Sequence, residues 1–212
     1  MIVLDIETSG LDSARCGIWQ IGALELENPE NVFFQEGRID DDDAVEQGAL
    51  SVIGKTEAEL RDVTKQSQKE LLYAFFMWAK KISGRNCICQ NPQFDVAFLF
   101  TKVRRLGMFE EIGTIIPQRS FDMHSIAAYK YYLVHKRFPA YAGRSTMNLS
   151  SVLTFCGMVD NRAAHNALED ARLTAECFNR IVFGKNLFND FKIFSIPFYL
   201  MPANEEEKHD NV

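Results

Sequence analysis

The chain has 212 residues, and 23 lysines and arginines against 29 aspartates and glutamates give it a formal net charge of −6. Apolar residues make up 47% and charged residues 25%, which are the proportions of a globular protein and exclude disorder as its dominant state. The length indicates one domain with a sizeable core. The acidic balance argues against a protein that binds polyanions by bulk charge, but it leaves a nucleic-acid substrate open.

Targeting segments are not expected from this sequence. The longest uninterrupted apolar stretch, residues 71–79, is about half as long as a bilayer requires, and Asp5 and Glu7 interrupt the first apolar run. The five cysteines are odd in number and scattered, which favours free thiols in a reducing compartment. We therefore expect a cytoplasmic protein that has no membrane contact.

The beginning of the chain carries strand patterns. Residues 1–6, 18–26 and 32–39 are β-branched and apolar runs, and a turn cluster at residues 28–31 precedes the third of them. This pattern predicts a three-stranded meander. The four aspartates at residues 40–43 lack the alternate spacing and the glycine bend of a calcium loop, so we interpret them as a solvated acidic loop.

Helical periodicity begins at residue 67. Apolar side chains recur at steps of three and four residues as far as residue 82, which predicts a helix with a buried aromatic face. A short buried strand at residues 87–90 is followed by helices at 95–106, 149–156 and 167–183, and a glycine follows each helix. Strands that alternate with helices after a meander predict an α/β or α+β sheet domain.

Two acidic residues lie inside the first predicted strand. Asp5 and Glu7 are two residues apart, so their side chains point to one face, while Ile2, Leu4 and Ile6 point to the other. Such a pair is costly to bury unless a cation meets it, whereas an edge strand with a wet face would need no cation. The pair alone is compatible with both interpretations.

Other candidate residues come from two distant segments. Asp95 opens a predicted helix, where the N-terminus favours a negative charge for structural reasons alone. A continuous helix would separate His165 and Asp170 by about 140°, so they can address one site only if His165 lies on the approach to the helix. Acids from three segments can nevertheless converge at one end of a sheet. Four carboxylates without strong basic partners indicate hard divalent cations, Mg²⁺ or Mn²⁺.

Three ordered motifs carry a resemblance to a known family. Residues 5–11 are similar to D-x-E-T-[ST]-G, residues 91–95 to N-x-x-F-D, and residues 165–170 to H-x-A-x-x-D. These are the motifs of the DEDDh family of 3′→5′ exonucleases. The resemblance extends over about residues 1–184, since residues 18–23 and 49–60 are also similar to segments of that family.

The resemblance implies a fold and domain limits. The fold would be α/β and RNase H-like, with a mixed five-stranded sheet flanked by helices. Residues 1–184 would form the exonuclease domain. Residues 185–212 would be a C-terminal extension that is partly packed and whose polar end is disordered.

The resemblance also implies a chemistry. Asp5, Glu7, Asp95 and Asp170 would be the catalytic carboxylates that hold two divalent ions, Mg²⁺ or Mn²⁺, and His165 would be the general base that takes a proton from the attacking water. A histidine has an unperturbed pKa near ~6.5, which suits this role at neutral pH. The enzyme would release nucleoside 5′-monophosphates from the 3′ end of single-stranded nucleic acid, with DNA preferred to RNA.

A pocket for the terminal nucleotide follows from the same resemblance. Thr8, Gly10 and Leu11 would hold that nucleotide, and Asn91 and Phe94 would line the pocket. Contacts of this kind tolerate different base sequences. A core position for Leu11 and Phe94 fits the sequence equally well.

Several alternatives stay open at this stage. The chain could be an exoribonuclease or oligoribonuclease, or a non-catalytic module that binds a partner on the same fold. The basic and aromatic segment 120–146 is compatible with a path for single-stranded nucleic acid and with an amphipathic helix followed by an ordered loop. The aromatic segment 185–201 could pack on the core or bind a protein partner, and a homodimer is possible.

Overall fold

The computed structural model describes residues 1–162 and 166–202. These residues form two compact units. The first contains Met1–Met123 and Asn161–Ala175, and the second contains His124–Asp160 and the chain from Glu176 onward. Helix α8 (Ala167–Phe183) contributes its first half to the first unit and its second half to the second. The predicted division at residue 184 stays a prediction.

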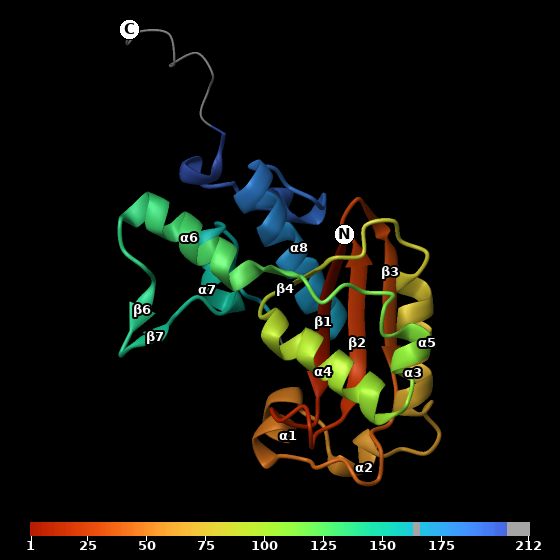
Figure 1. Ribbon diagram of the computed structural model, residues 1–212. Coiled ribbons are helices and arrows are strands. Elements are labelled where there is room, and N and C mark those ends of the chain that lie inside the picture. The colour runs from red at the N-terminus through yellow and green to blue at the C-terminus, as the bar shows by residue number, and fades with distance from the viewer. Residues whose placement is uncertain (163–165, 203–212) are drawn as a thin grey trace, which may run out of the picture. The chain divides into compact units, whose positions relative to one another are not determined.

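A mixed five-stranded sheet organises the first unit (Figure 1). Its strands are β1 (Ile2–Thr8), β2 (Ile18–Glu25), β3 (Asn28–Glu36), β4 (Cys87–Cys89) and β5 (Phe121–Asp122). The order is β3-β2-β1-β4-β5, with β1, β4 and β5 parallel and β2 and β3 antiparallel to their neighbours. Strand β1 is central, so the edge-strand interpretation of Asp5 and Glu7 is wrong. The predicted sheet flanked by helices is confirmed.

The hairpin between β2 and β3 differs from the prediction. Its turn lies at Leu26 and Glu27, and the expected turn cluster at 28–31 is the start of β3. Pro29 is tolerated there because β3 is an edge strand, where one row of backbone N–H groups has no partner strand. The side chain of Asn31 also supports the extended conformation, since it bonds to Glu25 and accepts a hydrogen bond from Trp78.

Helices α3 (Gln68–Ala79) and α4 (Pro92–Arg105) pack against the face of the sheet that carries Ile2, Leu4 and Ile6. A capping box between Ser67 and Glu70 starts α3. Helix α4 begins three residues earlier than predicted, because Pro92 is well suited to the first position of a helix. The short helices α1 (Gln47–Ile53), α2 (Glu57–Leu60) and α5 (Phe109–Ile112) complete the first unit.

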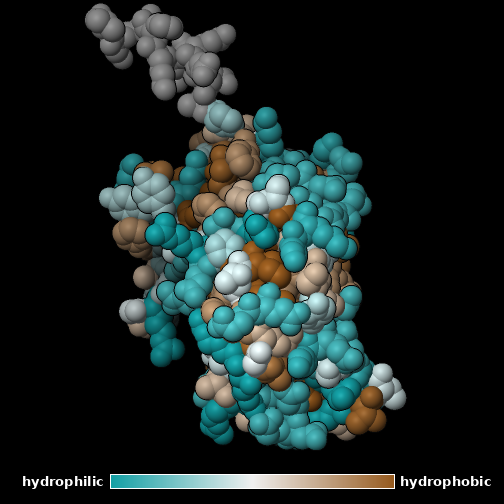
Figure 2. Space-filling model, turned by 45° about the vertical axis from the view of Figure 1, so that its right-hand side comes forward, coloured by the Kyte–Doolittle hydropathy of each residue, from teal (hydrophilic) through white to brown (hydrophobic). Residues whose placement is uncertain are grey.

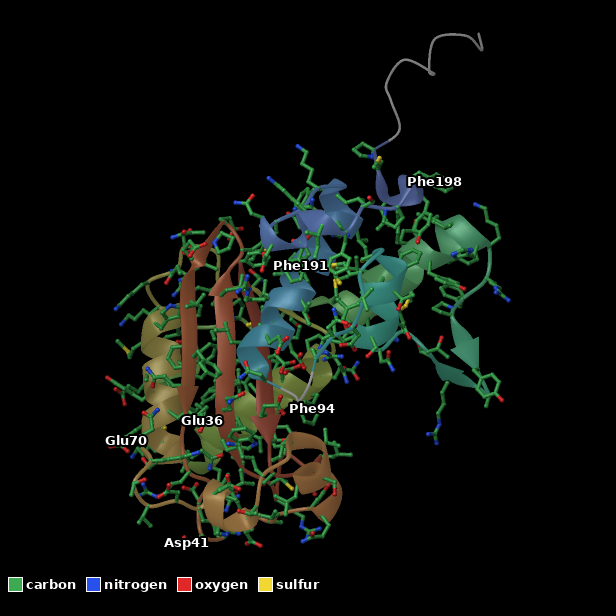
Figure 3. The ribbon with its side chains drawn as sticks, turned by 180° about the vertical axis from the view of Figure 1, so that it is seen from behind. Glu36, Asp41, Glu70, Phe94, Phe191 and Phe198 are labelled. Atoms are coloured by element: carbon green, nitrogen blue, oxygen red, sulfur yellow. The ribbon has the colours of Figure 1, made fainter. Side chains whose placement is uncertain are left out.

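The first half of α8 covers the opposite face of the sheet (Figures 1 and 3). Gly22 permits this contact, because a Cβ atom there would lie 2.1 Å from the backbone nitrogen of Leu168 and 2.2 Å from the carbonyl carbon of Ala167. Gln20 accepts a hydrogen bond from the Ala167 N–H at 2.8 Å. Asn166 accepts bonds from the next two N–H groups, at 3.1 Å each. The start of α8 is therefore fixed tightly to β2.

The acidic loop at residues 40–43 is not simply solvated, which corrects the sequence interpretation. The carboxylate of Asp43 is fully buried and lies 2.6 Å from the equally buried ammonium of Lys102 on α4. Arg105 and Gln68 also bond to Asp43, at 2.9 Å each. These side chains neutralise and satisfy the buried carboxylate. The run of acids therefore fastens α4 and the start of α3 to this loop.

The second unit contains α6 (Met123–His135) from its second residue onward, the strands β6 (Ala140–Tyr141) and β7 (Arg144–Ser145), and α7 (Leu149–Phe155). A buried ion pair between Arg180 and Glu176 holds the segment after α8. Arg180 donates to the carbonyls of Phe191 and Phe194, and Glu176 accepts bonds from the N–H groups at 187 and 188.

The aromatic C-terminal segment is partly packed and partly exposed. Phe188 is buried, and Tyr199 stacks on Phe155 with ring centroids 5.2 Å apart. Phe198, by contrast, is 84% exposed (Figure 3). Two 3₁₀ helices, η1 (Asp190–Ile193) and η2 (Phe198–Leu200), lie in this segment. The predicted polar end at residues 204–212 lies outside the described residues.

Surface properties agree with a protein built around internal cores. The face in Figure 2 is mainly hydrophilic, with small apolar patches. Within the described part of the chain, no helix is both long enough and apolar enough to span a bilayer. All five cysteines are free and buried, as the sequence predicted.

The close approach at Gly22 gives a direct test. Gly22→Ala should lower the free energy of unfolding by about 2 kcal/mol or more, because the methyl group collides with rigid backbone. Gly48→Ala is the matched control, since no atom lies within 4 Å of its added Cβ and the site is inside helix α1. The control should be neutral or stabilising by up to about 1 kcal/mol. Urea unfolding measures both, and equal stability of the two variants would contradict the packing described here.

The buried pair under the acidic loop gives a second test. Asp43→Asn should cost about 3–5 kcal/mol, because it leaves the Lys102 ammonium buried without its counter-charge. Adding Lys102→Met to that variant should recover part of the loss. Asp41→Asn, in the exposed part of the same loop, should change the stability little. Urea unfolding of the three variants checks this, and a double variant less stable than Asp43→Asn would argue against the pairing.

Candidate active site

Three carboxylates meet at one end of the sheet. Asp5 and Glu7 lie on β1, and Asp170 lies in the first turn of α8. One carboxylate oxygen of Asp5, one of Glu7 and one of Asp170 lie within 4.8 Å of one another. Period-two alternation points both β1 acids to the face that α8 covers, and the contacts at the start of α8 bring Asp170 to them.

The β2 residues that dock α8 are the cross-strand partners of the β1 acids. Gly22 pairs with Asp5, and Gln20 pairs with Glu7. Gly22 and Gln20 therefore lie on the same face of the sheet as Asp5 and Glu7. The sequence analysis noted residues 18–23 only as a similar strand and assigned them no role. The sequence feature that could have identified Gln20 and Gly22 is a polar residue and a glycine, two positions apart, in a mainly apolar strand.

Asp95 reaches the same end of the sheet from helix α4. It lies in the first turn of α4, buried, and its Oδ1 accepts a hydrogen bond from the backbone N–H of Ile6 at 3.2 Å. The β1–β4 pairing covers only Ile2 and Val3, so the Ile6 N–H is free to point toward α4. Asp95 therefore bonds to β1 between the two acids of that strand.

The carboxylates strongly perturb one another. Burial, and then the charges of Asp170 and Asp95, raises the pKa of Glu7 to about 8. Burial raises the pKa of Asp95 to about 7, although backbone N–H groups, that of Ile6 among them, act in the opposite direction. Burial and the neighbouring carboxylates raise the pKa of Asp5 well above its usual range. Without a cation, these pKa values favour the protonated forms of Asp5 and Glu7 at neutral pH.

The donor set suits divalent cations. Glu7 Oε1 is buried and has no hydrogen-bond partner among the described residues, which is costly unless a cation binds it. Arg162 donates to Asp170 at 2.9 Å, and its charge lowers the pKa of Asp5 and of Glu7. One guanidinium does not balance four carboxylates. Oxygen ligands of this kind hold Mg²⁺ or Mn²⁺. The sequence analysis did not select Arg162, although it stands three residues before the third motif.

The fifth predicted catalytic residue cannot be placed. His165 lies outside the described residues. Helix α8 begins at Ala167, and the predicted role of His165 stays a prediction.

The predicted nucleotide-binding turn follows β1. Thr8 is buried, and its hydroxyl donates to the carbonyl of Gly10 at 2.7 Å. Glu46 holds the same turn by accepting a bond from the Leu11 N–H at 3.1 Å. The Leu11 side chain is 78% exposed. A core position for Leu11 is therefore wrong, and the side chain is available to a ligand.

Asn91 is the N-cap residue of α4. Phe94 lies in the first turn of that helix (Figure 3). Asn91 is exposed, and its backbone carbonyl accepts the bond that closes the first turn. Phe94 is half-buried and lies with its ring centroid 4.8 Å from that of Phe98. It therefore packs partly against the core, and its contact with a substrate stays a prediction.

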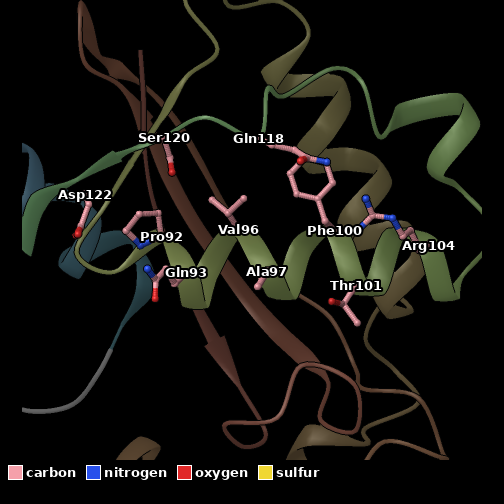
Figure 4. A pocket seen from close by; sticks show the side chains of 10 residues that line it. All are labelled: Pro92, Gln93, Val96, Ala97, Phe100, Thr101, Arg104, Gln118, Ser120 and Asp122. Atoms are coloured by element: carbon pink, nitrogen blue, oxygen red, sulfur yellow. The ribbon is translucent and has the colours of Figure 1, made fainter.

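A groove of about 530 Å³ runs beside α4 (Figure 4). One wall consists of α4 side chains and the other of residues just before and within β5. The lining residues are Pro92, Gln93, Val96, Ala97, Phe100, Thr101, Arg104, Gln118, Ser120 and Asp122. The groove starts at the helix turn that also carries Asp95.

A family model for exonucleases of the RNase T type matches residues 2–178. The PolC-type DNA polymerase III of Caldanaerobacter subterraneus subsp. tengcongensis is 26% identical over 181 residues, which are 85% of this chain and 11% of that protein. The PolC-type DNA polymerase III of Thermotoga petrophila is 28% identical, with 85% and 12% covered. The chain thus spans only a small part of the curated relatives that it matches.

Solved structures share the fold. A zinc-bound complex of E. coli ExoI with single-stranded DNA superposes with a TM-score of 0.67 and 17% identity, covering 90% of this chain and 42% of that one. The nuclease domain of 3′hExo, a DEDDh family member bound to rAMP, gives a TM-score of 0.59 and 14% identity, with 88% and 93% covered.

The sheet, its flanking helices and the carboxylates at one end define an RNase H-like nuclease domain. The chain belongs to the exonuclease family, as a member of the DEDDh group of 3′→5′ exonucleases. The predicted family and enzyme class are confirmed, and the family implies dependence on divalent metal ions.

The raised pKa values predict how metal-free stability depends on pH. The pKa of Glu7 is about 8 in the folded chain against an ordinary value of 4.5, so the folded state binds this proton more tightly. Stability should therefore fall as the pH rises from about 5 to 8. In EDTA, the unfolding temperature should drop by at least about 3 °C over this range, and Mg²⁺ should raise it more at pH 8 than at pH 6.

Asp5→Asn should weaken this pH dependence, because it removes one of the crowded charges. Glu110→Gln, a substitution at an exposed site, is the control and should leave the dependence unchanged. Differential scanning calorimetry measures both. A wild-type chain that becomes more stable with rising pH in EDTA would contradict the electrostatics of the site.

Proposed function

We propose that this chain removes nucleoside 5′-monophosphates from the 3′ end of single-stranded DNA by metal-dependent hydrolysis. The observation that carries the proposal is the convergence of Asp5, Glu7 and Asp170 within 4.8 Å, with buried Asp95 bonded between the two β1 acids. Family membership supplies the class of reaction. The names of the curated relatives, both DNA polymerases, favour DNA.

The four carboxylates would hold two ions, Mg²⁺ or Mn²⁺. When bound, such a pair lowers the pKa of a coordinated water and stabilises charge on the phosphate. Asp5, Glu7, Asp95 and Asp170 would hold the ions, and Asp5 is the acid on which the charges of the other three all act. The metal charges would also favour the ionised forms of Asp5, Glu7 and Asp95 at neutral pH.

The rest of the site would orient the substrate and move a proton. His165, which the family resemblance identifies as the general base, would accept a proton from the attacking water at a ring nitrogen. Exposed Leu11 would pack beside the terminal base, and Asn91 and Phe94 would face the same nucleotide. The turn held by Thr8 keeps Leu11 in place.

The test is mononucleotide release from single-stranded oligonucleotides in Mg²⁺. A 5′-labelled strand should shorten one nucleotide at a time, and a 3′-terminal label should leave first as a 5′-monophosphate. Asp5→Asn should reduce the rate by at least about 10³-fold, since it removes a ligand that serves both ions. His165→Ala should also reduce it and should flatten the pH–rate profile.

Glu110→Gln is the control again and should retain full activity. A matched RNA strand in the same assay tests the alternative of an exoribonuclease, and faster release from RNA would replace DNA as the proposed substrate. Release of no mononucleotide from either strand, or equal release by Asp5→Asn, would overturn the proposal and leave a non-catalytic binding module.

A further inference from the structure

One segment of the second unit has a charge opposite to that of the whole chain. Residues 123–159 contain four lysines and arginines and no aspartate or glutamate, in a chain whose net charge is −6. Lys136, Arg137 and Arg144 are exposed. Among the described residues, no ion pair involves these three side chains or Lys130. This segment therefore presents a local positive surface in an acidic protein.

Aromatic rings lie among these cations. Tyr141 is 80% exposed and Phe138 is 63% exposed. Tyr132 stacks on Phe138 with centroids 4.9 Å apart and planes inclined by 19°. Tyr141 is the cross-strand partner of Arg144 in the β6–β7 hairpin, so a ring and a guanidinium stand side by side. Large exposed rings lose the benefit of burial unless a ligand covers them.

The backbone of this segment contains two residues in a strained conformation. Two residues other than glycine have positive φ among those described, Lys136 at 56° and Ala142 at 50°, and both belong to this segment. Ala142 and Gly143 form the two-residue turn of the hairpin, in which both central residues need positive φ. Every residue from 140 to 146 is exposed, so core packing does not explain the hairpin. Strain of this kind concentrates at functional sites.

We propose that these residues form a binding surface for single-stranded nucleic acid. We call it the α6–hairpin surface and define it as Tyr132, Lys136, Arg137, Phe138, Tyr141 and Arg144. The cations attract the phosphates, and the rings stack on successive bases without selecting a sequence. The inference rests on the proposed function for its choice of polyanion. It adds a second contact for the substrate, separate from the carboxylates.

Binding without hydrolysis tests the surface independently of catalysis. The probe is a fluorescent oligothymidylate of about 30 nucleotides, titrated in EDTA at several salt concentrations. The triple variant Lys136→Gln, Arg137→Gln, Arg144→Gln should bind at least about tenfold more weakly. It should also reduce the slope of log affinity against log salt by roughly 2, because each phosphate contact on a single strand contributes about 0.7.

A matched control removes three exposed lysines from α3 and its C-terminal end: Lys69→Gln, Lys80→Gln, Lys81→Gln. It makes the same change in net charge and should leave both the affinity and the slope unchanged. Tyr141→Ala should weaken binding about fivefold or more, whereas Tyr141→Phe should not, because stacking needs the ring and not the hydroxyl. Near-ultraviolet circular dichroism confirms that each variant is folded.

The proposal is overturned if the triple variant and its control bind alike. It is also overturned if the triple variant instead converts a dimer to a monomer in sedimentation, since the surface would then bind a second copy of the chain. These outcomes are distinct from failure of the proposed function. If the chain releases no mononucleotide but the triple variant binds more weakly, only the proposed exonuclease function is refuted. If the chain is active but the triple variant binds as tightly as the wild type, only the proposed surface is refuted.

Discussion

Negative charge is concentrated at one end of the central strand, where the fold admits little water. Glu7, Asp95 and Asp170 are buried there beside Asp5, and Arg162 is the cation that the described residues supply. Repulsion within this group opposes folding unless cations bind. The surrounding structure therefore has to hold the acids in place against their own repulsion, and it does so with backbone contacts more than with charge.

Two residues of β2 contribute most to holding the acids in place. Gln20 and Gly22 stand opposite Glu7 and Asp5 and bring the start of α8 against the sheet. On the other side of β1, the bond from Ile6 to Asp95 fixes the first turn of α4. Further along α4, Lys102 is anchored by Asp43 in the loop after β3. Each acid is thus supported by a contact outside the site, as a preorganised metal site requires.

The two units differ in what they offer to a substrate. The first concentrates carboxylates that suit metal ions and the reacting phosphate. The second contains the α6–hairpin surface, where cations and exposed rings suit a single-stranded nucleic acid. A net negative charge is therefore compatible with binding a polyanion, because residues 123–159 carry four lysines and arginines and no acid.

The sequence by itself determined the sheet class, the order of the main elements and the candidate acids, because strand alternation and short motifs depend on neighbours in the chain. It did not determine the position of the β2–β3 turn or the burial of Asp43. Both depend on partners far away in sequence, such as Trp78 and Lys102. Only the tertiary structure decided that β1 is central, that Leu11 is exposed, and that Arg162 and Gln20 serve the site. Burial and long-range contacts set these properties, and they arise when distant segments pack together.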